Sequence, residues 1–124
     1  MLLFSGESHS VNRSYSLKRH KEFRYTYRTG RSQSGHLLTM VYAKSRTETI
    51  RIGFSVSKRV GNAVQRNRAK RRMRACISPM IGNLKGGCNL IVIAKPEVLD
   101  APFAELQKQT ETLLKRCGIW TDGQ

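Results

Sequence analysis

The sequence predicts an α+β fold, a two-layer sandwich in which helices pack on a central sheet in the order α-β-β-α-β-α. Apolar and polar residues alternate over residues 50–57, as in a strand with one buried face. Residues 89–95 form a near-continuous apolar run, which is typical of a strand inside a sheet. Apolar residues also recur with helical spacing after residue 62 and near the C-terminus. With 124 residues, 39% of them hydrophobic, the chain has enough apolar material for one domain with one core.

The first expected helix covers residues 17–29 and is strongly basic. Ser16 is expected to cap its start and Gly30 to end it, because serine favours N-caps and glycine favours helix ends. Phe23 and Tyr27 are four residues apart and therefore share one face of this helix. Each ring, taken alone, fits a stacking platform for nucleic-acid bases and a core position equally well.

Two strands are expected next, at residues 36–44 and 50–57, after a loop at residues 31–36. The short polar link between the two strands favours an antiparallel hairpin. The core face of the second strand is expected to hold Ile50, Ile52, Phe54 and Val56. Its other face, which holds Arg51, Gly53, Ser55 and Ser57, is expected to stay open.

Asn62 is expected to cap a second helix that ends near Ile77, before Pro79. At about 100° per residue, one side of this helix is apolar and the opposite side is polar and basic. The apolar side consists of Ala69, Met73, Cys76 and Ile77, and the opposite side of Asn67, Arg68, Arg71 and Arg74, with Lys70 at the edge. The helix is thus expected to pack on a domain. Arg66 falls toward the apolar side, so we expect it to snorkel or to form a hydrogen bond within the fold.

The last helix is expected to follow the apolar strand at residues 89–95. Asp100 is expected to cap it, with Pro102 in its first turn and Gly118 at its end. Its buried stripe is expected to consist of Phe103, Leu106, Thr110, Leu113, Leu114 and Cys117.

A long acid-free region is the strongest indication of function. Residues 58–74 hold eight Lys or Arg in 17 positions, and no Asp or Glu occurs between Glu48 and Glu97. Like charges repel, so such a region is expected to meet a polyanion. With a net charge of +15, this indicates nucleic acid, whose phosphates bind Lys and Arg with release of counterions. Charge alone leaves open whether the partner is RNA or duplex DNA.

The residues that would indicate protein-based catalysis do not form a recognisable pattern. His9, His20 and His36 lie in polar, basic segments without metal-ligand spacing. The chain has no Gly-rich phosphate-binding loop, and no acidic pair for catalytic metals occurs between residues 49 and 96. We therefore expect neither a catalytic residue nor a metal or cofactor site on the protein alone.

Cysteine usage and hydropathy indicate a cytoplasmic protein. Cys76, Cys88 and Cys117 are too scattered for a disulfide framework and are expected to be small buried side chains in a reducing cytosol. The sequence lacks a signal-peptide pattern and an apolar run long enough to span a bilayer. We expect no membrane partner.

Residues 55–74 are Ser-Val-Ser-Lys-Arg-Val-Gly-Asn-Ala-Val-Gln-Arg-Asn-Arg-Ala-Lys-Arg-Arg-Met-Arg. This segment resembles the signature of the bacterial ribonuclease P protein subunit. The signature has an Arg-Asn-Arg core, here Arg66-Asn67-Arg68, followed by Lys70-Arg71. The resemblance covers about residues 14–118. A match of this length is far more specific than a lone basic helix. It favours this family over a ribosome-associated or general RNA-binding module, and over a DNA-binding helix.

The resemblance implies a small protein that binds a large catalytic RNA, together with which it cleaves the 5′ leader from precursor tRNA. The RNA is implied to supply the active site with Mg²⁺. The implied fold is ribosomal-protein-like, with a left-handed βαβ crossover through the basic helix, against the usual right-handed preference. The residues implied to face the catalytic RNA are Lys58, Arg59, Arg66, Asn67, Arg68, Lys70, Arg71 and Arg74.

The leader is implied to lie in a cleft between the first helix and the sheet. The residues expected to line this cleft are Phe23, Tyr27, Arg51, Ser55 and Ser57. The family often has a further aromatic on the first strand, and Met40, Val41 or Tyr42 could occupy that place here. The expected organisation is a flexible segment at residues 1–15, a single RNA-binding α+β domain at residues 16–118 and a tail at residues 119–124.

Overall fold

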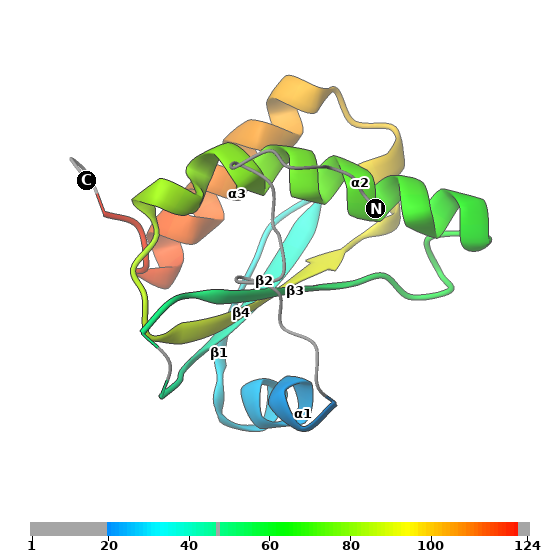
Figure 1. The fold of residues 1–124 in the computed structure, drawn as a ribbon. Helices are drawn as coiled ribbons and strands as arrows, with labels where there is room; N and C mark the ends of the chain where they lie inside the picture. The colour runs from blue at the N-terminus through cyan, green and yellow to red at the C-terminus, as the bar shows by residue number, and fades with distance from the viewer. Residues whose placement is uncertain (1–19, 47, 122–124) are drawn as a thin grey trace, which may run out of the picture.

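A four-stranded sheet forms the centre of the computed structural model, which describes residues 20–46 and 48–121. Its strands lie in the order β1-β2-β4-β3 (Figure 1). They are β1 (Arg31–Ser34), β2 (Leu38–Lys44), β3 (Arg51–Ser55) and β4 (Cys88–Ala94). β4 pairs antiparallel with β2 and parallel with β3, and β1 pairs antiparallel with β2. β4 therefore has a strand on each side, as its near-continuous apolar sequence predicts.

Helices cover both faces of this sheet. They are α1 (His20–Thr29), α2 (Ala63–Ile77) and α3 (Phe103–Cys117), with two short 3₁₀ helices at Ser78–Asn83 and Pro96–Leu99. α2 and α3 pack against each other on one face, and α1 lies on the opposite face (Figure 1). The α+β class and the packing of helices on a central sheet are confirmed.

The expected hairpin between residues 36–44 and 50–57 is wrong. β2 and β3 do not pair with each other, because β4 lies between them and pairs with both. β3, α2 and β4 form a parallel βαβ unit, the connection for which the family resemblance implies a left-handed hand. The short link between β2 and β3 sets only their distance along the chain, whereas the apolar β4 gains most by pairing on both edges.

The loop expected at residues 31–36 instead contains β1, a short strand at the edge of the sheet. Its sequence, Arg-Ser-Gln-Ser, lacks the β-branched and aromatic residues typical of strands, and three of its four residues are exposed. Main-chain pairing holds it on β2, with Arg31 opposite Tyr42 and Ser34 opposite Thr39. Backbone pairing without a buried side-chain pattern explains why the sequence did not predict it.

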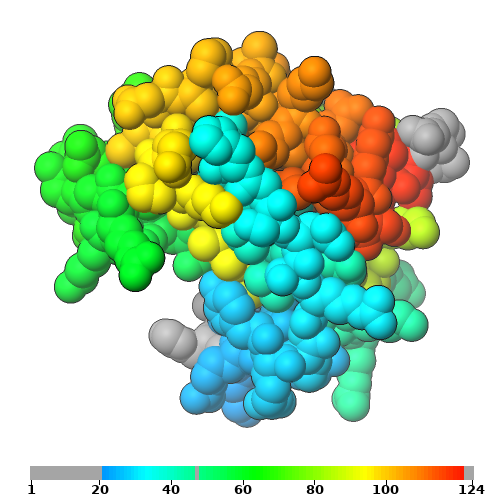
Figure 2. Space-filling model, turned by 180° about the vertical axis from the view of Figure 1, so that it is seen from behind, coloured from blue at the N-terminus to red at the C-terminus, as the bar shows by residue number. Residues whose placement is uncertain are grey.

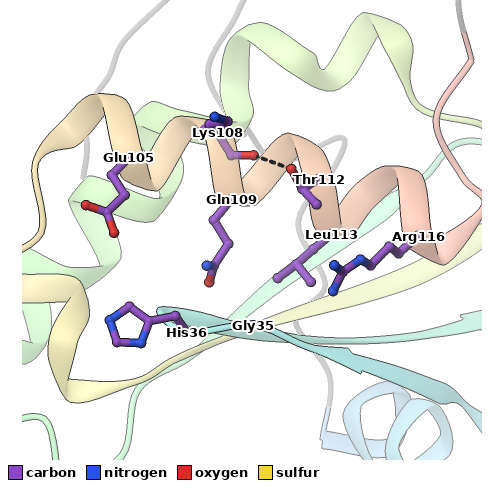
Figure 3. A pocket seen from close by; sticks show the side chains of 8 residues that line it. All are labelled: Gly35, His36, Glu105, Lys108, Gln109, Thr112, Leu113 and Arg116. Atoms are coloured by element: carbon purple, nitrogen blue, oxygen red, sulfur yellow. Dashed lines mark hydrogen bonds between the residues drawn. The ribbon is translucent and has the colours of Figure 1, made fainter.

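α3 fixes the turn between β1 and β2. Gln109 Oε1 accepts hydrogen bonds from Leu37 N at 2.6 Å and from Leu38 N at 2.9 Å. Lys95 Nζ donates to Gly35 O at 2.5 Å. A Cβ on Gly35 would come within 2.7 Å of the Gln109 side chain, which points at this turn (Figure 3). A side chain at this position would require the Gln109 side chain to move.

The main core lies between the sheet and the two helices α2 and α3. Its fully buried side chains include Leu38, Met40, Ile52, Met73, Ile77, Leu90, Leu106 and Leu114. A second, smaller cluster lies on the face of α1, where Val41 and Ile91 are buried and Phe23 and Ile93 pack on them. Successive strand residues point to opposite faces, so Met40 enters the main core and Val41 faces α1.

α3 differs from its prediction at its start. Pro102 is the N-cap, whereas Asp100 ends the preceding 3₁₀ helix, so the expected Asp100 cap is wrong. Phe103, expected in the buried stripe, is 39% exposed because it is the first helical residue; the other five expected members are buried. Gly118 ends the helix as predicted, with a φ of 79° that glycine tolerates best.

The chain after α3 belongs to the domain through at least residue 121. Ile119 is buried, and its carbonyl accepts a hydrogen bond from Lys85 N at 2.8 Å. Thr121 N donates to Asn83 O at 2.6 Å. Residues 119–121, expected to belong to a tail, therefore pack on the domain.

Some expectations concern residues that the structure does not describe. They are the flexible segment at residues 1–15, the Ser16 cap with the helix start at residues 17–19, and the environment of His9.

Candidate nucleic-acid interface

A capping box fixes the start of α2. Asn62 Oδ1 accepts from Gln65 N at 2.9 Å, and Gln65 Oε1 accepts from Asn62 N at 2.8 Å. This reciprocal pair satisfies two main-chain donors, which confirms Asn62 as the predicted cap. Gly61 precedes it with a φ of 152°, and a Cβ there would come within 2.0 Å of Gln65 Oε1. The start and the rotation of α2 are therefore well determined.

The inner side of α2 is as predicted, and so is the outer side except for Arg74, which is half-buried. The buried residues are Ala69, Met73, Cys76 and Ile77, each at most 1% exposed. The exposed residues on the opposite side include Asn67, Arg68 and Arg71, and Lys70 is half-buried at the edge. Arg68 and Arg71 are three residues apart on the helix, so they lie next to each other and can grip neighbouring phosphates.

Three other arginines of α2 also contact the fold. Arg66 Nη1 donates to the main-chain carbonyl of the residue before the cap at 2.8 Å, which confirms its expected internal hydrogen bond. Arg72 donates through Nη2 to Ala101 O, between the second 3₁₀ helix and α3. The Arg74 guanidinium lies over the Phe54 ring, 5.5 Å from its centroid. Partial burial lowers the pKa of Arg74 from its usual value. Arg68 and Arg71, by contrast, are exposed.

The turn before α2 adds two cations to the same surface region. Lys58 and Arg59 lie in a turn at residues 58–60 and are exposed. Ser57 Oγ accepts a hydrogen bond from Arg59 N at 3.3 Å, and Val60 is buried beneath the turn. Both cations therefore sit beside the start of α2, whose N-terminus also attracts anions.

A buried hydrogen bond and a packed ring help to attach α1 to the opposite face of the sheet. Asn89 Nδ2 of β4 donates to Thr26 Oγ1 at 3.2 Å, and both residues are buried. Phe23 packs on Val41 and on the other apolar residues of the small cluster. The Tyr27 ring lies 6.5 Å from the Phe23 ring at an interplanar angle of 38°, and Tyr27 is 46% exposed. The two rings share one side of α1, as predicted.

β3 brings two more of the expected cleft residues to the face that carries α1. Arg51 lies opposite Asn89 of β4, and Ser55 lies opposite Ile93. Both partners contact α1 or its apolar cluster, so Arg51 and Ser55 share that face. The buried Arg51 Nε finds no hydrogen-bond partner among residues 20–46 and 48–121. Ser57 is not brought together with them; it lies beyond the strand end and bonds to the turn before α2.

Of the three candidates on the first strand, Val41 is the one that faces α1. Met40 and Tyr42 belong to the main core side, whereas Val41 packs against the face of α1. The chain therefore has an aliphatic floor here, extended by Ile91 and Ile93 of β4. The strand register along β4, not any local motif, places these two residues in the candidate cleft.

The cysteines are free and buried, as expected. Burial raises the pKa of Cys76 to about 12 and of Cys88 to about 11. Burial, followed by the neighbouring Cys88, raises the pKa of Cys117 to about 12. All three remain protonated thiols at neutral pH and act as packing residues.

The described residues provide no cluster of metal ligands. Within residues 20–46 and 48–121, no three His, Cys, Asp or Glu side chains lie together so as to hold a metal ion. His36 is exposed at the turn between β1 and β2. Over the same part of the chain, no helix has the length and apolar character needed to cross a membrane.

Comparisons with known proteins agree with this geometry. The family model of ribonuclease P matches residues 11–118. A ribonuclease P protein component of Chloroflexus aurantiacus is 41% identical over 107 residues, which are 86% of this chain and 79% of the relative. A Staphylococcus aureus RNase P protein mutant superposes with a TM-score of 0.80 and 28% identity, over 86% of this chain and 91% of that chain. The RNase P protein of Thermotoga maritima has the same fold, with a TM-score of 0.74 and 23% identity, over 82% and 96%.

Proposed function

This chain belongs to the ribonuclease P protein family, and on that basis we propose that it binds the RNA subunit of ribonuclease P and the 5′ leader of precursor tRNA. It assists the endonucleolytic removal of the leader, which produces the mature 5′ end of the tRNA. The RNA subunit carries the active site, and Mg²⁺ bound to that RNA supplies the chemistry of cleavage. The protein acts in the cytoplasm, without a membrane partner.

The outward side of α2 is the observation that carries this proposal. The capped helix is packed through its apolar stripe, so its outer side chains are presented in a fixed direction. No carboxylate occurs between Glu48 and Glu97 to neutralise them. Arg68 and Arg71 offer forked donors that match phosphate geometry, and Asn67 can bond to a base edge or a ribose hydroxyl. This side of the protein binds the RNA subunit.

The face that carries α1 supports the second half of the proposal. Phe23 and Tyr27 provide rings, Arg51 provides a half-buried guanidinium, and Ser55 provides a hydroxyl. Unpaired bases can stack on such rings, while the folded body of a tRNA offers few of them. The leader therefore binds here, on the side of the sheet opposite α2.

Reconstitution tests the proposal. Protein freed of RNA and nucleases is combined with a bacterial ribonuclease P RNA made in vitro, and cleavage of labelled precursor tRNA is followed at low Mg²⁺. We expect the mixture to cleave at the mature 5′ end much faster than the RNA alone, and the protein alone not to cleave.

Two outcomes would contradict it. Cleavage by the purified protein alone would place the active site on the protein. The protein would instead be a general RNA-binding module if, at the same salt concentration, it bound an unrelated structured RNA of the same length as tightly as ribonuclease P RNA and did not stimulate cleavage.

A further inference from the structure

A cavity lies beside α1, on the side away from Phe23 and Tyr27. It has a volume of about 550 Å³ and is formed where the end of α1 meets the start of β1 and the end of β2, with Cys117 at the end of α3 also in its wall. Its lining residues include Tyr25, Arg31, Tyr42 and Lys44. Seen from behind, β1 lies between α1 and α3 at this edge of the molecule (Figure 2).

Helix geometry separates this cavity from the leader face. Thr26 points at the sheet. Because successive helical residues are about 100° apart, Tyr25 and Tyr27 lie on opposite sides of α1, one on each side of Thr26. Tyr27 shares its flank with Phe23, whereas Tyr25 lines the cavity with Thr29, four residues on. α1 thus carries an aromatic residue on each of its two sides.

The cavity is held open in a defined shape. Tyr25 Oη donates to Lys44 O at 3.3 Å, and Thr29 Oγ1 donates to Tyr25 O at 2.8 Å. Gly30 lets the end of α1 approach β2 closely, because a Cβ there would come within 2.7 Å of Tyr42 O. Tyr42 is half-buried and packs on the main core, so its ring lies on the face of the sheet opposite α1.

The charges around the cavity match a phosphate. Arg31 and Lys44 are exposed cations in its wall, and none of its lining residues is acidic. The cavity between α3 and the β1–β2 turn differs in this respect, since Glu105 stands among His36, Lys108 and Arg116 there (Figure 3). A phosphate in that smaller cavity of about 350 Å³ would meet a carboxylate.

We propose that the cavity beside Tyr25 binds one unpaired RNA nucleotide, with its base against the Tyr25 ring and its phosphate on Arg31 and Lys44. Aromatic rings next to cations, without acids, are the combination that single-stranded nucleic acid uses. This inference rests on the proposed function, because it assumes an RNA partner. The nucleotide comes either from the RNA subunit or from the leader.

Three substitutions with matched controls test the site in the full-length protein. Tyr25→Ala removes a ring that is 41% exposed, and Phe103→Ala on α3 removes one that is 39% exposed. Arg31→Ala and Lys44→Ala remove exposed cations, and Lys108→Ala removes the same charge from the other cavity. Melting temperatures are recorded for all variants.

Two binding measurements distinguish the source of the nucleotide. The first is affinity for ribonuclease P RNA, and the second is affinity of the assembled complex for precursor tRNA and for mature tRNA. We expect Tyr25→Ala to weaken one of these at least about fivefold, the lower end for a stacked base. A loss in the first assigns the nucleotide to the RNA subunit, and a loss confined to precursor tRNA assigns it to the leader.

The controls distinguish a failure of this inference from a failure of the proposed function. If the unsubstituted protein binds the RNA and stimulates cleavage while the three site variants match Phe103→Ala and Lys108→Ala, the site is wrong and the proposed function stands. If Tyr25→Ala lowers the melting temperature, the RNA affinities of Arg31→Ala and Lys44→Ala decide whether the cavity binds a nucleotide. A Tyr25→Phe variant that binds as weakly as Tyr25→Ala would also overturn stacking, because it keeps the ring and loses only the bond to Lys44 O.

Discussion

α1 and α2 lie on opposite faces of one sheet and are attached in different ways. α2 packs on β3, β4, α3 and both 3₁₀ helices, through four side chains that face inward. Among the described elements, α1 has its main contacts with β2 and β4, and of residues 21–29 only Thr26 is buried. The residues proposed to bind RNA on α2 are largely distinct from those that hold it in place. On α1, Phe23 belongs to both groups.

This difference determines how mutations should act. On α2, stability and RNA affinity are expected to respond to different residues. On α1, the same substitution is expected to change both. The largest effect should come from the buried side of α2.

Met73→Ala should lower the free energy of unfolding by about 2–5 kcal/mol, because it leaves a cavity in the main core. Met73 is 1% exposed, and the substitution keeps all charges of α2. Urea denaturation measures the effect. Val64→Ala, at a residue of the same helix that is 74% exposed, is the control and should have little effect. A stable Met73→Ala variant would show that α2 is less integral to the core than its burial indicates.

Arg68→Ala and Arg71→Ala should each weaken affinity for the RNA subunit by about 1–3 kcal/mol, the size of a charge-assisted hydrogen bond. The melting temperature should not change, since both side chains are exposed. The slope of log affinity against log salt should become shallower by about one for each phosphate that the variant no longer binds. Arg116→Ala on α3 is the control for charge. An unchanged slope would mean that Arg68 and Arg71 point away from the RNA.

Phe23→Ala and Tyr27→Ala should each weaken binding of precursor tRNA by about 1–3 kcal/mol if the ring stacks fully on a leader base. Binding of mature tRNA should barely change. Phe23→Ala should also lower the melting temperature, because Phe23 packs on Val41 and Ile91, whereas Tyr27 is largely exposed. Equal losses for precursor and mature tRNA, together with destabilisation by Tyr27→Ala, would assign both rings to structure alone.

Asn62→Ala should have the smallest effect, a loss of about 1 kcal/mol of stability within the 0.5–2 range of N-caps. It removes the acceptor for Gln65 N without touching the outer cations. Thermal unfolding measures the change, and Asn62→Ser should recover most of it because serine also caps helices. A full loss in Asn62→Ser would indicate that the amide has a role beyond capping.

Elements whose sequence has a strong hydrophobic pattern could be predicted. Elements whose position depends on pairing with other strands could not. The buried stripe of α2, its Asn62 cap and the interior strand β4 each have a local pattern that burial enforces. β1 has none, because only its backbone is paired. The order of β2, β3 and β4 depends on which strand gains most from two neighbours, which a short link cannot indicate.

The same distinction applies to the candidate sites. The basic side of α2 follows from one helix and could be predicted from spacing alone. Val41, Ile91 and Ile93 reach the face proposed to bind the leader through strand register, which the expected hairpin had wrong. The cavity beside Tyr25 joins residues from α1, β1, β2 and α3, so no motif at fixed spacing could have indicated it.

The central position of β4 also has a consequence for biosynthesis. β2 and β3 both find their partner in residues 88–94, which are synthesised after the basic helix. Until those residues leave the ribosome, β3 has no neighbour, β2 has only β1, and the inner side of residues 63–77 has no completed sheet to cover. Pairings this far apart in sequence close late, because the loop must be formed first. Only β1 and β2 can therefore pair early, and the rest of the domain should assemble in one late step.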